Sequence, residues 1–418
     1  MKILFAMTYY RPYVSGPIIY VENLAHELIE RGHEVTILTS QYDPGLPRHE
    51  RIGPLNVVRV PVLFRISKGV IMPSFFFEAL ALARRHEVMA IQVPQFEAPV
   101  LALVARLAAI PSTLTYHCDV QLPAGLFNRI VDKVVLGGNV VAALLSDQII
   151  AYTEDYARHS PLMHRFMDKV TVIPPPVEMQ PPSDSVRQAF RLQHELTGKK
   201  VIGICGRFAT EKGFEQLVQA IPTLLEEFPN LEVLHAGEFE NVIGEQAYRD
   251  RLRPILESYG GHWRSLGVLG GDELAAFFEA CDVTVLPSLN RTESFGFVQV
   301  ESMLNGTPVV ASNLPGVRVP VRTTGMGRIT PIGDSAALAE NLAAVLRHPD
   351  EYRAPRATVE AEYSAERSAS EYLALFGRLL APSARRLGLL GPMIGAALFA
   401  LFVALTERQR RSLPQDVE

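Results

Sequence analysis

The chain has 418 residues, of which 48% are hydrophobic and 20% are charged, and this length favours two domains over a single hydrophobic core. The composition excludes global disorder, and the formal net charge of −5 gives no electrostatic basis for a nucleic-acid partner. Three widely spaced cysteines, Cys118, Cys205 and Cys281, indicate neither a disulfide framework nor a zinc knuckle and fit a reducing cytosol.

The first part of the chain alternates short apolar runs with longer stretches of helical periodicity. The opening run is too short for a signal peptide, and we predict that it forms a buried strand. Gly32 ends a predicted helix, and a β-branched strand begins directly after it. The alternation predicts a parallel sheet with helices on both faces. The predicted strands are 3–7, 34–38, 90–93 and 149–151, and the helix is 19–31.

Three consecutive prolines at 174–176 separate this series from a second one, because they forbid regular helix or central strand. We therefore predict an α/β fold with a first domain over 1–175 and a second doubly wound domain over 176–362. A helix over 363–381 is expected to cross back to the first domain. The strands predicted in the second domain are 200–205, 231–236, 283–286 and 308–311.

The C-terminal region contains an uncharged run over 387–405, with arginines on both sides. A helix of 19 residues spans about 28 Å, which is close to the hydrocarbon thickness of a bilayer. Pro392, three glycines and the arginines on both flanks leave a transmembrane helix, a monotopic or re-entrant helix and a helix buried in an oligomer as alternatives. Of these, we favour attachment to a membrane through a hydrophobic C-terminal helix.

The strongest motif lies in the second domain, where a loop after a strand runs into a helix. It contains Glu293 and, two turns into the helix, Glu301, with seven residues between them. The backbone amides at the start of this helix favour a phosphate, because orphan N–H groups and the helix dipole meet there. One carboxylate is placed to reach a sugar and the other a ribose.

In this motif, and in the continuation over 305–311, the chain resembles glycosyltransferase family 4. The resemblance implies a GT-B fold, in which two Rossmann-like domains face a cleft, and transfer of a sugar with retention of configuration. It assigns the donor sugar to Glu293 and the ribose to Glu301. The nucleotide-sugar-binding residues that it implies between them are Ser294, Phe295, Gly296 and Phe297.

Two cations follow the first strand of the second domain. Arg207 and Lys212 lie five positions apart in a turn framed by Gly206 and Gly213, where they can neutralise a departing diphosphate. They match the family's diphosphate-binding pair.

The first domain contributes three further candidates. The loop at Ser15 and Gly16 keeps one of the two glycines with which the family approaches the diphosphate, and Pro17 removes an amide donor there. His117 follows a strand at the place where the family commonly has a histidine near the donor sugar and the acceptor. Asp119 is the nearby candidate to accept the acceptor proton, although a carboxylate here is often only a helix cap.

The sequence therefore predicts a hexosyltransferase that uses a nucleotide-diphosphate sugar and a hydroxyl acceptor, either lipid-linked or a precursor of a cell-surface glycan. Catalytic roles fall to His117, Asp119 and Glu293, with no metal and no cofactor besides the donor substrate. The catalytic domains are expected at the cytoplasmic face of the membrane. The alternatives are a catalytically silent sugar-nucleotide-binding scaffold, an epimerase and a phosphorylase of the same architecture.

Overall fold

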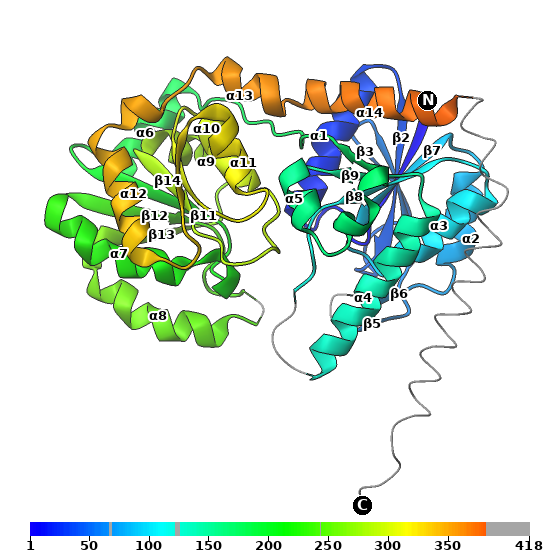
Figure 1. Ribbon diagram of the computed structural model, residues 1–418, viewed down its shortest axis with the longest axis horizontal. Helices are drawn as coiled ribbons and strands as arrows, with labels where there is room; N and C mark the ends of the chain where they lie inside the picture. The colour runs from blue at the N-terminus through cyan, green and yellow to red at the C-terminus, as the bar shows by residue number, and fades with distance from the viewer. Residues whose placement is uncertain (67–68, 122–125, 243, 382–418) are drawn as a thin grey trace, which may run out of the picture. The chain divides into compact units, whose positions relative to one another are not determined.

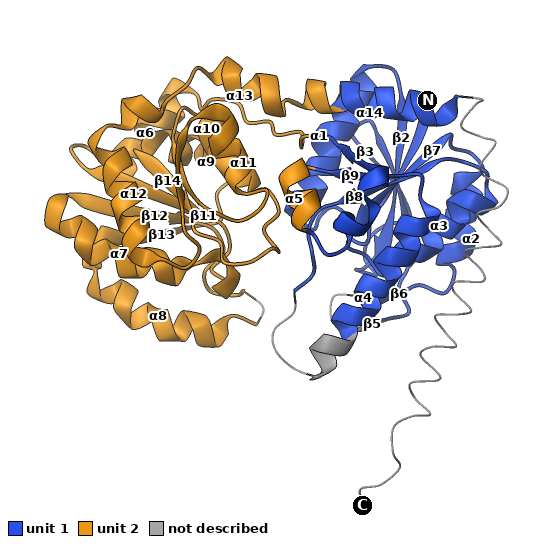
Figure 2. Cartoon of the chain, in the orientation of Figure 1, with its two compact units in different colours: residues 1–151, 160–173, 369–418 blue, residues 152–159, 174–368 orange. Residues whose placement is uncertain are grey.

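The computed structural model describes residues 1–66, 69–121, 126–242 and 244–381, which form two compact units (Figures 1 and 2). Unit 1 comprises Met1–Ala151, Ser160–Ile173 and the chain from Ala369, and unit 2 comprises Tyr152–His159 and Pro174–Ser368. The chain thus passes into unit 2 at the run of prolines where we placed the domain boundary. One difference is the segment Tyr152–His159, which we expected in the first domain and which packs within unit 2.

Unit 1 contains an eight-stranded sheet in the order β10-β9-β8-β7-β1-β2-β4-β3. All neighbours pair in parallel except β3 and β4, which are antiparallel, and β5 and β6 form a separate antiparallel hairpin. The chain winds outward in both directions from β1 and β7, so the switch point of the sheet lies between these two strands. The elements are β1 Lys2–Ala6, α1 Gly16–Glu30, β2 Glu34–Gln41, β3 His49–Ile52, β4 Leu55–Pro61, β5 Phe64–Ile66, β6 Gly69–Ile71, α2 Phe75–Ala83, β7 Val88–Val93, α3 Ala98–Leu107, β8 Ser112–Tyr116, α4 Leu126–Leu145, β9 Gln148–Ala151, η1 Met163–Lys169 and β10 Val170–Val172.

Unit 2 contains a six-stranded parallel sheet in the order β13-β12-β11-β14-β15-β16, with its switch point between β11 and β14. Its elements are α5 Glu154–His159, α6 Asp184–Gln193, β11 Lys200–Cys205, η2 Thr210–Lys212, α7 Phe214–Glu227, β12 Leu231–Ala236, α8 Gln246–Ser258, η3 Gly260–His262, β13 Trp263–Gly267, α9 Gly271–Ala280, β14 Val283–Leu286, α10 Phe297–Leu304, β15 Val309–Ser312, α11 Arg318–Thr324, β16 Gly327–Thr330, α12 Ser335–Arg347, η4 Pro349–Tyr352 and α13 Arg356–Tyr363.

Two hydrophobic clusters cover the two faces of this second sheet. One joins the strands to α7, α8 and α12, and the other joins them to α6 and α9. Because both faces are covered by helices, the strands are apolar almost throughout, which is the pattern that predicted a parallel sheet. Two doubly wound α/β units are therefore confirmed.

The last described helix is α14, Ala365–Leu380, which begins in unit 2 and belongs to unit 1 from Ala369 (orange in Figure 1). It lies within the range 363–381 that we predicted for a crossing helix. The hydrophobic helix predicted at 387–405 lies outside the described residues. Over the part of the chain that the structure describes, no helix is both long enough and apolar enough to cross a membrane.

Candidate active site

The two motif loops of unit 2 follow β11 and β14, the neighbouring strands at the switch point of the sheet. They touch through their backbones: the amide of Leu289 donates to the carbonyl of Glu211 at 2.9 Å. Gly213 has a φ of 72°, and a Cβ atom there would lie 2.0 Å from the carbonyl oxygen of Pro287, so only glycine fits. Ligands of open α/β sheets bind at such a place, beyond the carboxyl ends of the central strands.

The contact between these loops brings the predicted charges together. Lys212 Nζ lies 2.7 Å from Glu293 Oε2, and their side chains are 26% and 15% exposed. Burial lowers the pKa of Lys212, but the charge and the hydrogen bond of Glu293 outweigh it and leave this pKa raised. Arg207 forms an ion pair with Glu211, four residues further on. Both cations therefore already face carboxylates.

The loop that carries Glu293 ends at the start of α10. The side chain of Asn290 accepts from the amide and the hydroxyl of Thr292, which fixes the turn before Glu293. Gly296 has a φ of 79° and directly precedes Phe297, the first residue of α10. The backbone amides of the first helical turn therefore begin a few residues after Glu293. This is the arrangement that favours a phosphate at a helix start.

Glu301 lies on α10 in a half-buried position, and burial raises its pKa to about 7. Its charge and that of Lys212 both act on the thiol of Cys205 at the end of β11, whose pKa is raised to about 12, mainly by burial. Glu301, Lys212 and Cys205 are therefore close enough to interact electrostatically. Unit 2 thus brings Arg207, Lys212, Glu293 and Glu301 to the same end of the same sheet.

His235, a residue that sequence reasoning missed, holds the start of the Arg207 loop in place. Its Nε2 atom lies 2.8 Å from the carbonyl oxygen of Gly206, and the ring is fully buried among aromatic side chains. Burial lowers the pKa of His235 to about 4, so the imidazole is neutral and donates to this carbonyl. Glu211 was missed as well. The partner of His235 lies 29 positions away and is set by the fold, whereas the partner of Glu211 is Arg207, four positions earlier in the same loop.

In unit 1, His117 follows β8 and is 5% exposed. Its amide donates to the carbonyl of Val93 at 2.9 Å, and its Nε2 atom lies 2.9 Å from Oε1 of Gln92 on β7. The ring of Tyr20 packs edge-on against the imidazole at 5.3 Å. Burial lowers the pKa of His117 to about 3, so a neutral imidazole lies beyond the carboxyl end of a central strand.

Asp119 is held by two hydroxyl groups of unit 1. Its Oδ1 atom accepts from Tyr116 and from Ser160, both at 2.9 Å, and the residue is 6% exposed. These bonds tie the end of β8 to the chain that precedes η1. The two bonds therefore fix the orientation of this carboxylate.

Gly16 is the first residue of α1, and Ser15 precedes it with an extended backbone. The carbonyl of Ser15 accepts from the amides of Ile18 and Ile19, which closes the first turn of the helix. Gly16 thus lies at the start of a helix that follows β1, one of the two strands at the switch point of unit 1.

Comparison with known proteins identifies two families. Residues 186–361 match the family described as glycosyl transferases group 1, and residues 15–176 match the glycosyl transferase 4-like domain. The two matches follow one another and together cover most of the chain. The first includes Arg207, Lys212, Glu293 and Glu301.

Two relatives that match over most of their length are also glycosyltransferases. The chain is 29% identical over 399 residues to a 2-deoxystreptamine glucosyltransferase of Streptomyces kanamyceticus, covering 87% of this chain and 98% of the relative. It is 27% identical over 363 residues to a D-inositol 3-phosphate glycosyltransferase of Corynebacterium efficiens, covering 79% and 82%.

Solved structures show the same fold. Anabaena HepE, solved with UDP and glucose, matches with a TM-score of 0.72 at 19% identity, over 91% of this chain and 100% of the other. Sucrose-phosphate synthase of Thermosynechococcus elongatus matches with a TM-score of 0.70 at 21% identity, over 90% and 98%. With both family models matched in order, the chain belongs to glycosyltransferase family 4, and it is a retaining glycosyltransferase of the GT-B fold that uses a nucleotide-sugar donor.

Proposed function

We propose that this enzyme transfers a hexosyl group from a UDP-sugar to a hydroxyl group of a lipid-linked acceptor. The main observation that supports a nucleotide-sugar donor is the 2.7 Å contact between Lys212 and Glu293. These residues lie on the loops that follow the two central strands of unit 2. Glucosyl- and mannosyltransferases among the relatives support a hexosyl group, and the UDP in the HepE structure supports uracil as the base.

In this proposal Arg207, Lys212, Glu293 and Glu301 each have one role. Arg207 and Lys212 bind the diphosphate together with the amides at the start of α10, which stabilises the leaving group by electrostatics. Glu293 accepts hydrogen bonds from hydroxyls of the transferred sugar, and Glu301 accepts from the ribose. The contacts of Arg207 with Glu211 and of Lys212 with Glu293 support these roles, because they hold the cations in place before the donor binds.

The transfer breaks the bond between the anomeric carbon and the diphosphate oxygen and forms a bond from the acceptor oxygen to the same face of that carbon. The acceptor proton passes to the departing diphosphate. His117 of unit 1 is neutral and contributes a hydrogen bond to a sugar hydroxyl, not a positive charge. Gly16 allows the diphosphate to approach the start of α1.

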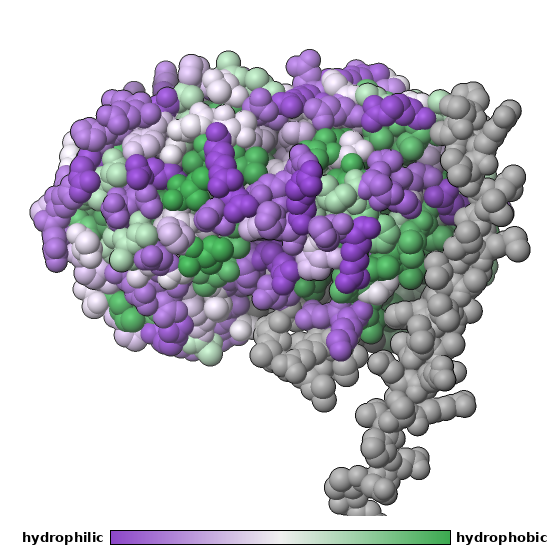
Figure 3. Space-filling model, in the orientation of Figure 1, coloured by the Kyte–Doolittle hydropathy of each residue, from purple (hydrophilic) through white to green (hydrophobic). Residues whose placement is uncertain are grey.

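Two features support a lipid-linked acceptor at the cytoplasmic face of a membrane. Hydrophobic side chains gather on the face of unit 1 shown in Figure 3. Phe96, which precedes α3, is 46% exposed, and Val134 on α4 is 50% exposed. These residues, with Pro99 and Val141, line a pocket of about 170 Å³ between the two helices. The apolar run at 387–405 is the second feature, and it provides a membrane contact in this proposal.

The donor side is tested by nucleotide release from UDP-, GDP- and ADP-sugars with a membrane extract as acceptor. We expect release from a UDP-sugar, reduced about a hundredfold in Glu293→Ala and in Lys212→Ala. Lys199→Ala is the matched control, since it removes a lysine paired with Glu232 at 2.6 Å near the opposite end of β11. Release from a GDP-sugar alone would refute uracil as the base of the donor. Full activity of both variants would refute the proposed roles of Glu293 and Lys212.

The acceptor side is tested with a lipid-linked acceptor and its water-soluble headgroup at equal concentrations. We expect the lipid-linked form to be used at least tenfold more efficiently, with the preference reduced in Phe96→Ser and in a chain ending at 385. Equal use of both acceptors by the full chain would refute the lipid-linked acceptor and leave the donor assignment intact.

A further inference from the structure

The helix α5 follows a strand of unit 1 in the sequence, yet it packs within unit 2 with the rest of Tyr152–His159. Residues of this segment restrain the loop over 291–297, which carries Glu293 and Gly296. Tyr152 and Tyr156 contact the loop directly, and Asp155 contacts the neighbouring residues Gly316 and Arg318. All three sets of contacts lie inside unit 2.

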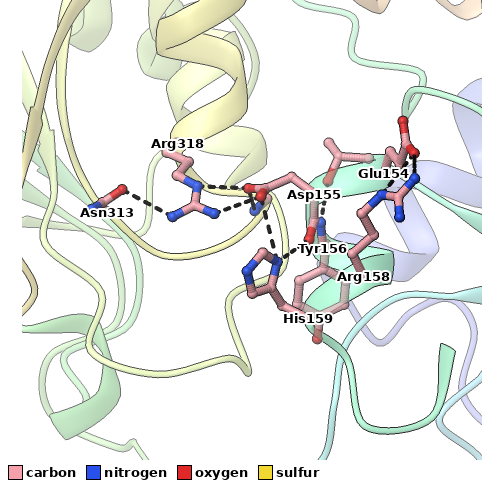
Figure 4. Close-up of polar contacts among 9 residues, drawn as sticks. Glu154, Asp155, Tyr156, Arg158, His159, Asn313 and Arg318 are labelled. Carbon is pink, nitrogen blue, oxygen red and sulfur yellow. Dashed lines mark hydrogen bonds and ion pairs between the residues drawn. The ribbon is translucent and has the colours of Figure 1, made fainter. Parts of the chain in front are cut away.

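The first contact is made by the carboxylate of Asp155. It accepts from Arg318 Nε at 2.8 Å and Nη2 at 2.6 Å, and also from the backbone amide of Gly316 at 2.9 Å (Figure 4). Burial raises the pKa of Asp155, but the hydrogen bonds from Arg318 and Gly316 outweigh it and leave this pKa lowered. The carboxylate is therefore charged and holds the loop after β15 by both of its oxygens.

Gly316 passes this restraint to the loop over 291–297. A Cβ atom at Gly316, where φ is 81°, would lie 2.0 Å from the carbonyl oxygen of Ser294 and 3.0 Å from Cβ of Tyr156. The backbone of Gly316 thus lies between α5 and the residue that follows Glu293. A shift of the Gly316 backbone would move Ser294 with it.

The other two contacts hold the ends of the loop. The hydroxyl of Tyr156 donates to the carbonyl of Arg291 at 2.9 Å, two residues before Glu293. The ring of Tyr152 packs edge-on against Phe295 at 5.9 Å and against Phe297 at 5.6 Å. The loop over 291–297 is therefore restrained before Glu293, directly after it, and at the start of α10.

We propose that Asp155 and Tyr156 are positioning residues for the diphosphate and the donor sugar. They act through Gly316, Arg318 and Arg291, and they hold Glu293 and the first amides of α10 in the geometry that binds the diphosphate sugar. This inference rests on the proposed function, in which the loop over 291–297 binds the diphosphate sugar. Binding groups must be held to within about half an ångström, so a loosened loop loses affinity for the diphosphate sugar before it loses its fold.

The experiment uses the full chain with Asp155→Asn and Tyr156→Phe, and it measures affinity for UDP and for UMP by calorimetry. UMP lacks the second phosphate. We expect UDP affinity to fall about tenfold in Asp155→Asn and about threefold in Tyr156→Phe, with UMP affinity within about twofold of wild type. The Michaelis constant for the UDP-sugar should rise in parallel.

Glu227→Gln is the matched control, since it breaks another bidentate pair of unit 2, between Glu227 and Arg347. It should alter neither affinity. A fall in melting temperature in Asp155→Asn with an unchanged ratio of UDP to UMP affinity would overturn the inference, because Asp155 would then be structural only. Failure of the wild type to bind UDP or to turn over a UDP-sugar would instead refute the proposed function, which separates the two results.

Discussion

Nε2 of His117 lies 2.9 Å from Oε1 of Gln92, and this contact selects the tautomer of the imidazole. The amide nitrogen of Gln92 lies 3.3 Å from the carbonyl oxygen of Ala90, which can only accept. The amide oxygen of Gln92 therefore faces His117 and accepts from a protonated Nε2, so that Nδ1 carries the lone pair. A neutral imidazole in this tautomer can donate only from Nε2 and accept only at Nδ1.

Loss of this contact should lower activity without unfolding the protein. Gln92→Met keeps the size of the side chain and removes the acceptor, so we expect kcat/KM to fall about tenfold. Gln148→Met is the control, because it removes a glutamine of the same sheet that bonds to Thr171. With a pKa of about 3, His117 should add no ionisation to the kcat/KM profile above about pH 5. Equal rates for Gln92→Met and wild type would rule out this role for Gln92.

The Lys212–Glu293 pair should show coupled stability. Lys212→Met leaves the Glu293 carboxylate, 15% exposed, without its cation, which should cost about 1 to 3 kcal/mol. The double variant Lys212→Met/Glu293→Gln removes the uncompensated charge, so it should recover stability without recovering activity. Thermal melts and rates on the four proteins of this cycle check the prediction. Additive losses of stability would show that the pair is not coupled.

Glu301→Gln should stabilise the nucleotide-free protein at high pH. The pKa of Glu301 is raised from 4.5 to about 7 in the fold, so its ionised form is penalised above pH 7 by up to about 3 kcal/mol. The penalty shrinks as pH falls from 7 to 4.5 and vanishes below 4.5, where the carboxyl is protonated in both states. The variant should therefore melt higher than wild type at pH 8 and equally at pH 4.5. A constant difference across this range would contradict the assignment.

Comparison of Gly316→Ala with Gly333→Ala should separate the cost of a steric conflict from the cost of a strained backbone. Gly316 and Gly333 have φ values of 81° and 74°, but only the first would place a Cβ atom within 4 Å of other atoms. Gly333→Ala should cost about 1 kcal/mol for the left-handed backbone, and Gly316→Ala should cost more and weaken UDP binding. Equal melting temperatures for the two variants would refute the predicted conflict with Ser294.

Local chemistry explains why the candidate donor residues could be selected from the sequence. A diphosphate needs cations and free amides beside a turn, so Arg207, Lys212 and the start of α10 appear as short motifs, and the fold brings the loops that carry them into contact. The two sheets were predictable because their strands are buried on both faces and read as apolar runs. By contrast, β3 is largely polar, and its antiparallel pairing with β4 depends on a turn that the apolar pattern does not mark.

Contacts between distant positions could not be predicted in this way. Asp155 and Arg318 are separated by 163 positions, and neither belongs to a recognisable motif. The bonds of Asp119 to Tyr116 and Ser160 likewise became visible only in the fold.

Because Tyr152–His159 packs within unit 2, it also determines where the chain can be joined to that of a relative in a chimeric protein. A chimera joined at the prolines would pair the donor loop of one parent with the α5 of another, and Asp155, Tyr156 and Tyr152 would face foreign partners. An exchange of donor specificity should therefore transfer residues 152–159 together with 174–368, as two inserts from the same parent. Unit 2 is thus encoded by two separate stretches of sequence, and a chimera keeps its internal contacts only when both stretches come from the same parent.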